Sequence, residues 1–337
     1  MRTVIAATLL LLAGCSSSAM TPTAPSSSDG ALRARSFGVT PFNAPTSAFP
    51  GAVSTEPTGI RGQYITATVT LNTGATLGGL YNRNSKTWVQ IAYPGAQSTA
   101  AYGPKPIKGG YLIVGSFKNA GQKGDDGFVF NSVTKQYKSI IVPPILCDPQ
   151  SCNYTIAHSV YTVGKRYLVV GNYDAGTKAP TIAGHAFLFD SSRKAISTID
   201  VKNAVSTTAY GIWIDGKTVA VAGGYADKKG RHAYVRDIVG GNDFLTYDYP
   251  KAALTHFEGI TGAGGPGNYN VVGDYTKPRD KAVYGFYMQI RNWIAWPPIV
   301  IGKLSANSVS VRDVIGVYNP GSGISGYITM LPVQDPP

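Results

Sequence analysis

The clearest pattern in the chain is a short apolar strand that ends in a glycine and an aromatic residue, and it recurs. Residues 168–173 read Leu-Val-Val-Gly-Asn-Tyr. Related segments lie at residues 112–117, 219–225, 270–275 and 313–318, with a degenerate copy at 64–69. The glycines of the five clear copies are 43 to 56 residues apart. A spacing of about 40–55 residues in a chain of short strands is typical of β-propeller blades.

Each repeat predicts four strands. A short first strand, such as residues 207–212, precedes a tight turn, such as Asp-Gly-Lys at 215–217, and then the apolar strand. An aromatic third strand follows, as at residues 185–189, and a fourth strand ends near proline or a polar turn, as at residues 293–296. No segment has sustained helical periodicity, so we expect an all-β fold.

The two ends of the repeat region are complementary. The last repeat, residues 308–331, has no fourth strand. Residues 50–55 (Pro-Gly-Ala-Val-Ser-Thr) match residues 94–99 (Pro-Gly-Ala-Gln-Ser-Thr), which lie at the junction between two repeats, so the segment before residue 50 takes the place of a repeat's end. The sequence therefore predicts a β-propeller over residues 34–337, with six four-stranded blades and a ring closed by an N-terminal strand. Closure removes exposed sheet edges.

The N-terminus has the pattern of a processing signal. Residues 4–12 are an apolar run too short to span a bilayer as a mature helix. Leu12-Ala13-Gly14-Cys15 resembles the bacterial lipobox, in which the cysteine is lipidated. We expect a lipoprotein signal peptide at residues 1–14 and, at residues 15–33, the lipidated Cys15 with a flexible Ser/Pro tether. An ordinary secretory signal is the alternative.

The residue after Cys15 is Ser16, which by resemblance to Gram-negative sorting favours the outer membrane. We expect a protein anchored to the bacterial cell envelope, on its periplasmic or surface face. Outside the cytoplasm Cys147 and Cys152 should form a disulfide. A metal site is the rival interpretation, but no further ligand completes it, so we expect no metal and no cofactor.

The formal net charge of +12 is compatible with anionic partners such as lipid headgroups, acidic glycans or nucleic acid. Lysine and arginine are scattered singly along the sequence, and the expected compartment argues against nucleic acid. We expect a monomer that contacts the membrane through its lipid.

The residue just before the glycine (a serine in one repeat) of each first strand is the candidate binding site. These residues are Thr58, Tyr102, His158, Tyr210 and Glu258. In a propeller the first strand lines the central channel, so they would form a ring near its mouth. Their identities differ while their neighbours repeat, and such side chains could hold a sugar or peptide. A solvated channel without a ligand is the alternative.

Other polar residues receive structural interpretations. His185 and His232 recur with the repeat, which favours a role in blade packing. The glycine-rich segment 262–267 is predicted to be a long turn. Asp174, Asp227 and Asp274 are predicted to begin turns, with an acidic ring formed by the three as the alternative. No catalytic motif is present.

His185-Ala186-Phe187-Leu188 and, less exactly, His232-Ala233-Tyr234 resemble the bacterial extracellular repeats named after their His-Ala-Phe signature. The resemblance covers about residues 50–330 and implies a propeller-like β-repeat protein outside the cytoplasm. It implies little about activity.

The sequence thus favours an envelope lipoprotein that binds a protein or glycan partner as a binding or scaffold module. The partner would meet the channel mouth or the loops that carry the two cysteines. The alternative is a glycan hydrolase or lyase in which His158 and Glu258 transfer protons at the axis. A purely structural envelope protein is a third hypothesis.

Overall fold

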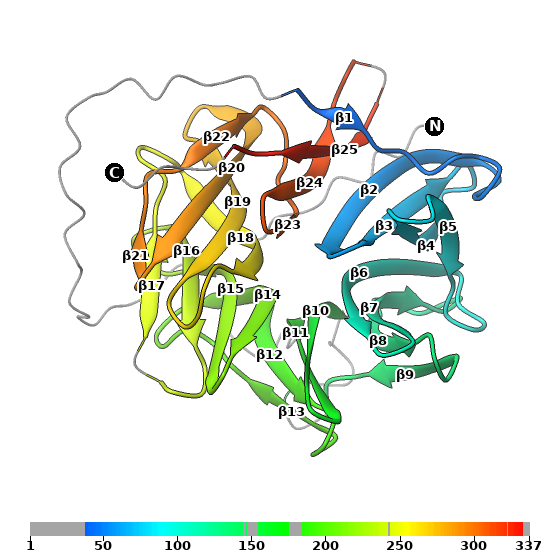
Figure 1. Cartoon of the computed structure of the whole chain (residues 1–337), viewed down its shortest axis with the longest axis horizontal. Coiled ribbons are helices and arrows are strands. Elements are labelled where there is room, and N and C mark those ends of the chain that lie inside the picture. The colour runs from blue at the N-terminus through cyan, green and yellow to red at the C-terminus, as the bar shows by residue number, and fades with distance from the viewer. Residues whose placement is uncertain are drawn as a thin grey trace.

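The computed structural model describes residues 38–143, 146, 154–174, 184–241, 243–321 and 323–332. In this part of the chain, six antiparallel sheets stand in a ring around a central axis (Figure 1). The fold is a six-bladed β-propeller, as the sequence predicted. Among the described residues, no helix is long and apolar enough to cross a membrane.

The first four blades are built alike. In each, four consecutive strands pair in chain order, starting from the strand at the axis. Blade 1 consists of β2 (Ala52–Arg61), β3 (Tyr64–Leu71), β4 (Thr76–Asn82) and β5 (Thr87–Ile91). Blade 2 consists of β6 (Ser98–Ile107), β7 (Gly110–Lys118), β8 (Asp126–Asn131) and β9 (Gln136–Ile140). Blade 3 consists of β10 (Thr155–Val163), β11 (Arg166–Asp174), β12 (Gly184–Asp190) and β13 (Ala195–Thr198). Blade 4 consists of β14 (Ser206–Asp215), β15 (Thr218–Ala226), β16 (Arg231–Asp237) and β17 (Phe244–Tyr247).

Blade 5 departs from the prediction at its outer edge. It contains β18 (Leu254–Gly262), β19 (Tyr269–Lys277), β20 (Asp280–Arg291), β21 (Ile294–Ala295) and β22 (Ile299–Gly302). The predicted fourth strand at residues 293–296 supplies only the two residues of β21, while β22 pairs with the middle of β20. The reason is that β20 is twelve residues long and extends into a hairpin. Two prolines then interrupt pairing, because proline has no N–H to donate, before β22 resumes it.

Blade 6 joins the two ends of the chain. Its strands are β23 (Ser308–Ser310), β24 (Asp313–Tyr318), β25 (Ser325–Met330) and β1 (Thr40–Pro41). Thr40 pairs with Ile328 and Pro41 with Tyr327. The prediction that an N-terminal strand closes the ring is confirmed, and Figure 1 shows β1 lying beside β25.

The recurring glycine and aromatic residue have distinct packing roles. A Cβ atom on Gly171 would lie 2.0 Å from the carbonyl oxygen of Ile156, so the first strand leaves no room for a side chain there. The aromatic residue that follows helps to join blades. Phe117 of blade 2 stacks at 3.6 Å on Tyr93, which follows the last strand of blade 1, and Tyr275 stacks at 3.7 Å on Tyr249 in the same way.

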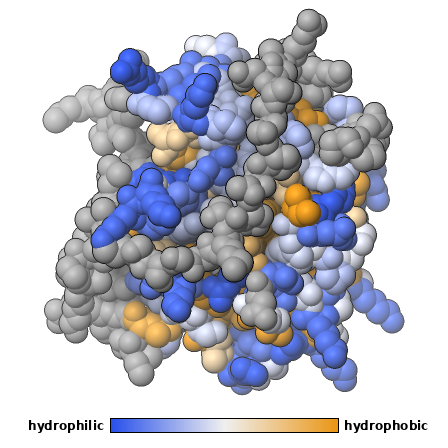
Figure 2. All heavy atoms as spheres, turned by 90° about the vertical axis from the view of Figure 1, so that its left-hand side faces the viewer, coloured by the Kyte–Doolittle hydropathy of each residue, from blue (hydrophilic) through white to orange (hydrophobic). Residues whose placement is uncertain are grey.

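The apolar core is distributed between neighbouring blades. One cluster combines Leu80 and Ile91 of blade 1 with Ile113 and Phe128 of blade 2. Comparable clusters join the later blades. On the side of the ring seen in Figure 2, hydrophobic residues occur as small separate spots among hydrophilic ones.

The ring has two different faces because all six inner strands run in the same direction. We call the face at which they begin the mouth face; it also carries the connections between blades. The opposite face, the hairpin face, carries the turns that join first to second and third to fourth strands. The glycine-rich segment 263–268 is a long turn on the hairpin face, as predicted.

Candidate functional site

The five predicted ring residues share one backbone feature. Thr58, His158, Tyr210 and Glu258 are each the extra residue at an interruption of the pairing between the first and second strands. Tyr102, together with Gly103, occupies the corresponding interruption in blade 2. A β-bulge redirects the side chain of its extra residue. The five blades thus present a variable side chain from one repeated geometry.

The aromatic members of this set lie side by side. The ring of His158 is 4.9 Å from that of Tyr102 and 4.7 Å from that of Tyr210, measured between centroids. Tyr210 lies 6.1 Å from a further ring, that of His256 on β18. We call Tyr102, His158, Tyr210 and His256 the aromatic arc; it crosses blades 2 to 5.

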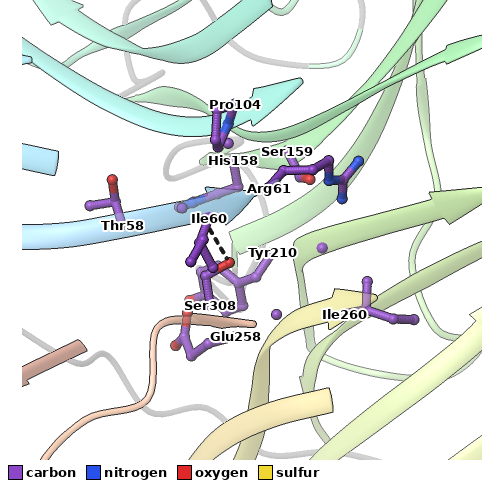
Figure 3. A pocket seen from close by; sticks show the side chains of 14 residues that line it. Thr58, Ile60, Arg61, Pro104, His158, Ser159, Tyr210, Glu258, Ile260 and Ser308 are labelled. Atoms are coloured by element: carbon purple, nitrogen blue, oxygen red, sulfur yellow. Dashed lines mark hydrogen bonds between the residues drawn. The ribbon is translucent and has the colours of Figure 1, made fainter. Parts of the chain in front are cut away.

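Directly beyond the bulges the channel is closed. Gly59, Gly103, Ser159, Gly211, Gly259 and Ser308, one small residue from each blade, line the cavity there together with Thr58, His158, Tyr210 and Glu258 (Figure 3). A Cβ atom on Gly103 would lie 2.7 Å from the carbonyl oxygen of His158, so neighbouring inner strands are in contact. The cavity measures about 20 Å³, room for about one water molecule. A larger ligand would therefore rest on the ring from the mouth face.

Carboxylates gather beside the aromatic arc. His256 Nε2 lies 2.6 Å from Glu258 Oε1, and Asp274 on β19 is the register partner of His256. Glu56 stands two residues before Thr58 on β2 and is exposed to solvent. Glu56 and Glu258 are the only glutamates in the sequence. We call His256, Glu258, Asp274 and Glu56 the acidic cluster.

Burial shapes the protonation of these groups. It raises the pKa of Asp274 to about 7, with a further rise from Glu258, opposed by His256 and by the N–H of Ala306, which donates to Asp274 Oδ1 at 2.8 Å. The pKa of Glu56 is raised by its depth in the ring and then by Glu258. The pKa of His256 is also raised, because Glu258 and Asp274 outweigh the opposing effect of burial. The acidic cluster thus favours bound protons.

The aromatic arc behaves differently. Burial lowers the pKa of His158 to about 3, so its imidazole is neutral at ordinary pH. Burial also raises the pKa of the Tyr102 and Tyr210 hydroxyls, which therefore keep their protons. Neutral rings thus line this side of the mouth, and the hydroxyls of Tyr102 and Tyr210 are hydrogen-bonded to Ser116 and Thr208.

The sequence pointed to Glu258 as a ring residue and to Asp274 only as an alternative to a turn, and it did not single out Glu56 and His256. Glu56 and His256 each precede a predicted ring residue by two positions, and the two-residue period of a strand is the signal that points to them. The prediction that Asp274 begins a turn is wrong, because Asp274 lies buried within β19.

The acidic cluster also has the donor atoms of a metal site, which the sequence did not lead us to expect. Ligand atoms of His256, Glu258 and Asp274 all lie within 4.8 Å of one another. An imidazole nitrogen and two carboxylates are donors that suit zinc and similar divalent cations. In the structure, Glu258 and His256 form a hydrogen-bonded pair through these atoms.

The hairpin-face end of the channel has the opposite character. The guanidinium of Arg61 reaches from blade 1 to the carbonyl oxygens of Val160 in blade 3 (3.4 Å) and Ile212 in blade 4 (3.2 Å). It also lies 5.1 Å from the ring centroids of both Tyr161 and Trp213. Arg61 therefore spans the axis and blocks this end.

The two other histidines lie in the outer part of their blades. His185 Nδ1 contacts Asp200 at 2.6 Å, and His232 Nδ1 contacts Asp248 at 2.7 Å. Each ring packs on the recurring aromatic residue of its own blade, which agrees with the predicted packing role. Asp227 does begin a turn, since its carboxylate accepts the N–H of Lys229. Cys15, Cys147 and Cys152 lie outside the described residues.

Comparison with known proteins identifies an architecture. The chain matches no protein-family model and no curated protein. Among solved structures, it is similar to YjhT, with a TM-score of 0.51 and 13% identity over 85% of this chain and 96% of that one. It is also similar to the SapL1 lectin in complex with α-methyl fucoside, with a TM-score of 0.50 and 12% identity over 84% and 99% of the two chains. A thermostable family-43 glycoside hydrolase gives a TM-score of 0.43 and 15% identity over 73% and 94%. At these identities the likeness shows the propeller fold alone.

Proposed function

We propose that this protein is a binding propeller of the bacterial cell envelope that holds a glycan at the mouth of its channel. The observation that carries the proposal is the aromatic arc beside the acidic cluster, on one face of a closed ring. Aromatic faces stack on the C–H surface of sugars, while carboxylates and hydroxyls bond to sugar hydroxyls. A lectin is among the proteins that share the fold, which is compatible with this use of it.

The charge of the mouth narrows the ligand class. Three carboxyl groups and a single imidazole lie there. Asp274 and Glu56, with their raised pKa values, repel an anionic sugar only where they have lost their protons, and a protonated carboxyl donates to a neutral sugar hydroxyl. A neutral or amino sugar therefore fits better than an acidic one, although the protein as a whole is strongly basic. An envelope protein bound at the same mouth remains the other form of the binding hypothesis.

The envelope location is part of the proposal and rests on the lipobox-like segment that ends at Cys15 and on the resemblance to His-Ala-Phe repeats. Lipidation would fix the chain to a membrane, with residues 15–33 as its tether. Cell fractionation tests this step: wild type should sediment with membranes and Cys15→Ala should not. Equal distribution of the two proteins would remove the anchor from the proposal.

The binding step is tested on a glycan array that carries neutral, amino and acidic oligosaccharides, followed by calorimetry on the best hit. We expect binding to neutral or amino sugars, with Tyr210→Leu and Glu258→Gln each weakening it about tenfold, or about 1.4 kcal/mol. Phe244→Ala, on the exposed outer edge of blade 4, is the control and should bind normally. Binding that neither mouth variant weakens would place the site elsewhere.

A second function, glycan hydrolysis, is favoured by the two glutamates. Most glycoside hydrolases use a pair of carboxyl groups, one of them protonated. Desolvation within the ring, and then Glu258, raise the pKa of Glu56, so these two glutamates fit the roles better than the predicted pair of His158 and Glu258, since His158 is too weakly basic. Release of reducing ends from bound oligosaccharides separates the two functions. Turnover abolished by Glu56→Gln, with binding retained, would establish hydrolysis; binding without turnover supports the binding module.

A further inference from the structure

The described turns carry more net positive charge on one face of the ring than on the other. The described turns of the hairpin face carry nine lysines and arginines and one aspartate. The described turns of the mouth face carry seven lysines and arginines and four aspartates, and the acidic cluster lies in its centre. Residues that are scattered singly along the sequence are thus brought together, because the repeat places equivalent turns side by side.

Six lysines define this basic face. Lys86, Lys135 and Lys194 occupy the same place in the turn between third and fourth strands of blades 1, 2 and 3, with φ angles of 55°, 60° and 52°. Lys108, Lys165 and Lys217 lie in the turn between first and second strands of blades 2, 3 and 4. All six are exposed.

The chain enters the described ring at this same face. The backbone oxygen of Gly38 accepts a hydrogen bond from Thr329 Oγ1 at 3.1 Å, near the end of β25 that lies on the hairpin face. From there the chain continues through β1 toward the mouth face, because Thr40 pairs with Ile328 and Pro41 with Tyr327. Cys15 precedes Gly38 by 23 residues, a length of chain that spans at most about 80 Å when fully extended.

We propose that the hairpin face docks on the anionic lipid headgroups of the membrane to which the protein is anchored. This rests on the proposed envelope location, although the docking itself needs only the basic face. Lysines near an anionic membrane each strengthen binding roughly fivefold, and the effect decays within a Debye length of about 8 Å at physiological salt. The anchor and the charge would act on the same side of the ring, and the glycan-binding mouth would point away from the membrane.

The test uses the chain from residue 16 onward, which carries no lipid and keeps every described strand, including the closing pair β1 and β25. Its binding is measured by co-sedimentation with vesicles of phosphatidylcholine containing 30% phosphatidylglycerol, at low and at high salt. One triple variant is Lys108→Gln, Lys165→Gln, Lys217→Gln on the hairpin face. The matched control is Lys202→Gln, Lys228→Gln, Lys229→Gln, which removes the same charge from exposed positions on the mouth face.

We expect binding to the anionic vesicles that is lost at high salt, a decrease of at least tenfold in the hairpin-face variant and at most a twofold decrease in the control. Equal losses in the two variants would show attraction by net charge alone and would overturn the docking face, as would the absence of vesicle binding by wild type. Preference for a soluble polyanionic glycan over vesicles would also overturn it. The glycan array is repeated with the hairpin-face variant, so that failure of docking is distinguished from failure of the proposed function. If the variant still binds sugars, the proposed function stands even where docking fails.

Discussion

The two ends of the channel are built from the same repeated strand and have opposite chemistry. At the mouth end Glu258 and Asp274 lie with ligand atoms within 4.8 Å of each other, and burial, then Glu258, raises the pKa of Asp274. The surrounding protein, then Glu258, also raises the pKa of Glu56, although Glu56 is exposed. At the hairpin end the charge of Arg61 meets two carbonyl oxygens and two aromatic rings. At the mouth end one imidazole, that of His256, lies among several carboxyl groups and pairs with Glu258. At the hairpin end burial lowers the pKa of the cation Arg61 to about 10, and burial together with Arg61 lowers the pKa of its neighbour Lys105 to about 8.

This difference indicates where the molecule is receptive. Perturbed pKa values are a common mark of binding and catalytic sites, but burial produces them at both ends. The mouth differs because it offers an imidazole and carboxylates, whose atoms lie within 4.8 Å of one another. A buried arginine that bridges blades across the axis is better explained by closure of the ring. The repeated backbone determines where a side chain lies, whereas the side chain in each blade determines what that place can do.

The largest expected effect comes from the constriction that separates the two ends. Gly103→Val would place its Cβ 2.7 Å from the carbonyl oxygen of His158 and 2.8 Å from Ser159 Cα, so blades 2 and 3 would have to move apart. We expect the free energy of unfolding, measured with denaturant, to fall by about 3 kcal/mol. Ser159→Ala, at the same level of the ring, adds no atoms to the contact and should change it by no more than about 1 kcal/mol. A Gly103→Val protein as stable as wild type would mean that the two ends are not separated by contact between blades.

A smaller effect is expected at the closed end. Arg61→Met keeps much of the length of the side chain but removes two hydrogen bonds and the contacts with Tyr161 and Trp213, and we expect a loss of about 2 kcal/mol in unfolding free energy. Arg61→Lys retains the charge but not the planar guanidinium, so its unfolding free energy should lie between those of wild type and Arg61→Met. A Met variant at least as stable as wild type would show that the cost of burying Arg61 cancels its contacts. Arg61 would then not stabilise the ring, and the hairpin end could not be explained by closure of the ring.

Much of this architecture could be predicted from the sequence because it depends on local and repeated signals. The spacing of the glycines predicts the blades, and the match between residues 50–55 and 94–99 predicts closure by the N-terminal strand. The five ring residues could be found because each stands at the same place in its repeat. Glu56 and His256 stand two positions before a ring residue, so the period of the strand could have pointed to them. Asp274 could not be found this way, since it comes from the second strand of its blade. The basic face is likewise visible only once the turns are placed side by side.

The smallest expected effect tests the acidic cluster through pH. The pKa of Asp274 is about 7 in the folded protein and about 3.8 when unfolded, so the folded chain binds this proton more tightly. Its contribution to stability is fully present below about pH 4 and is lost as the pH rises through 7. Asp274→Asn cannot titrate and keeps an oxygen for the Ala306 N–H, as Asn172 does for the Ala209 N–H at 2.7 Å in blade 3.

We therefore expect Asp274→Asn to be more stable than wild type at pH 8, by on the order of 1 kcal/mol, and to lose this advantage by pH 5. The difference between the two proteins is the quantity to measure, because His158 acts in the opposite direction. Its lowered pKa makes the fold lose stability as the pH falls below 6.5, and it does so in both proteins. A difference that does not vary between pH 5 and 8 would contradict the raised pKa of Asp274. A wild type more stable than the variant at pH 8, with the excess removed by a chelator, would show that His256, Glu258 and Asp274 bind a metal ion that balances their charge.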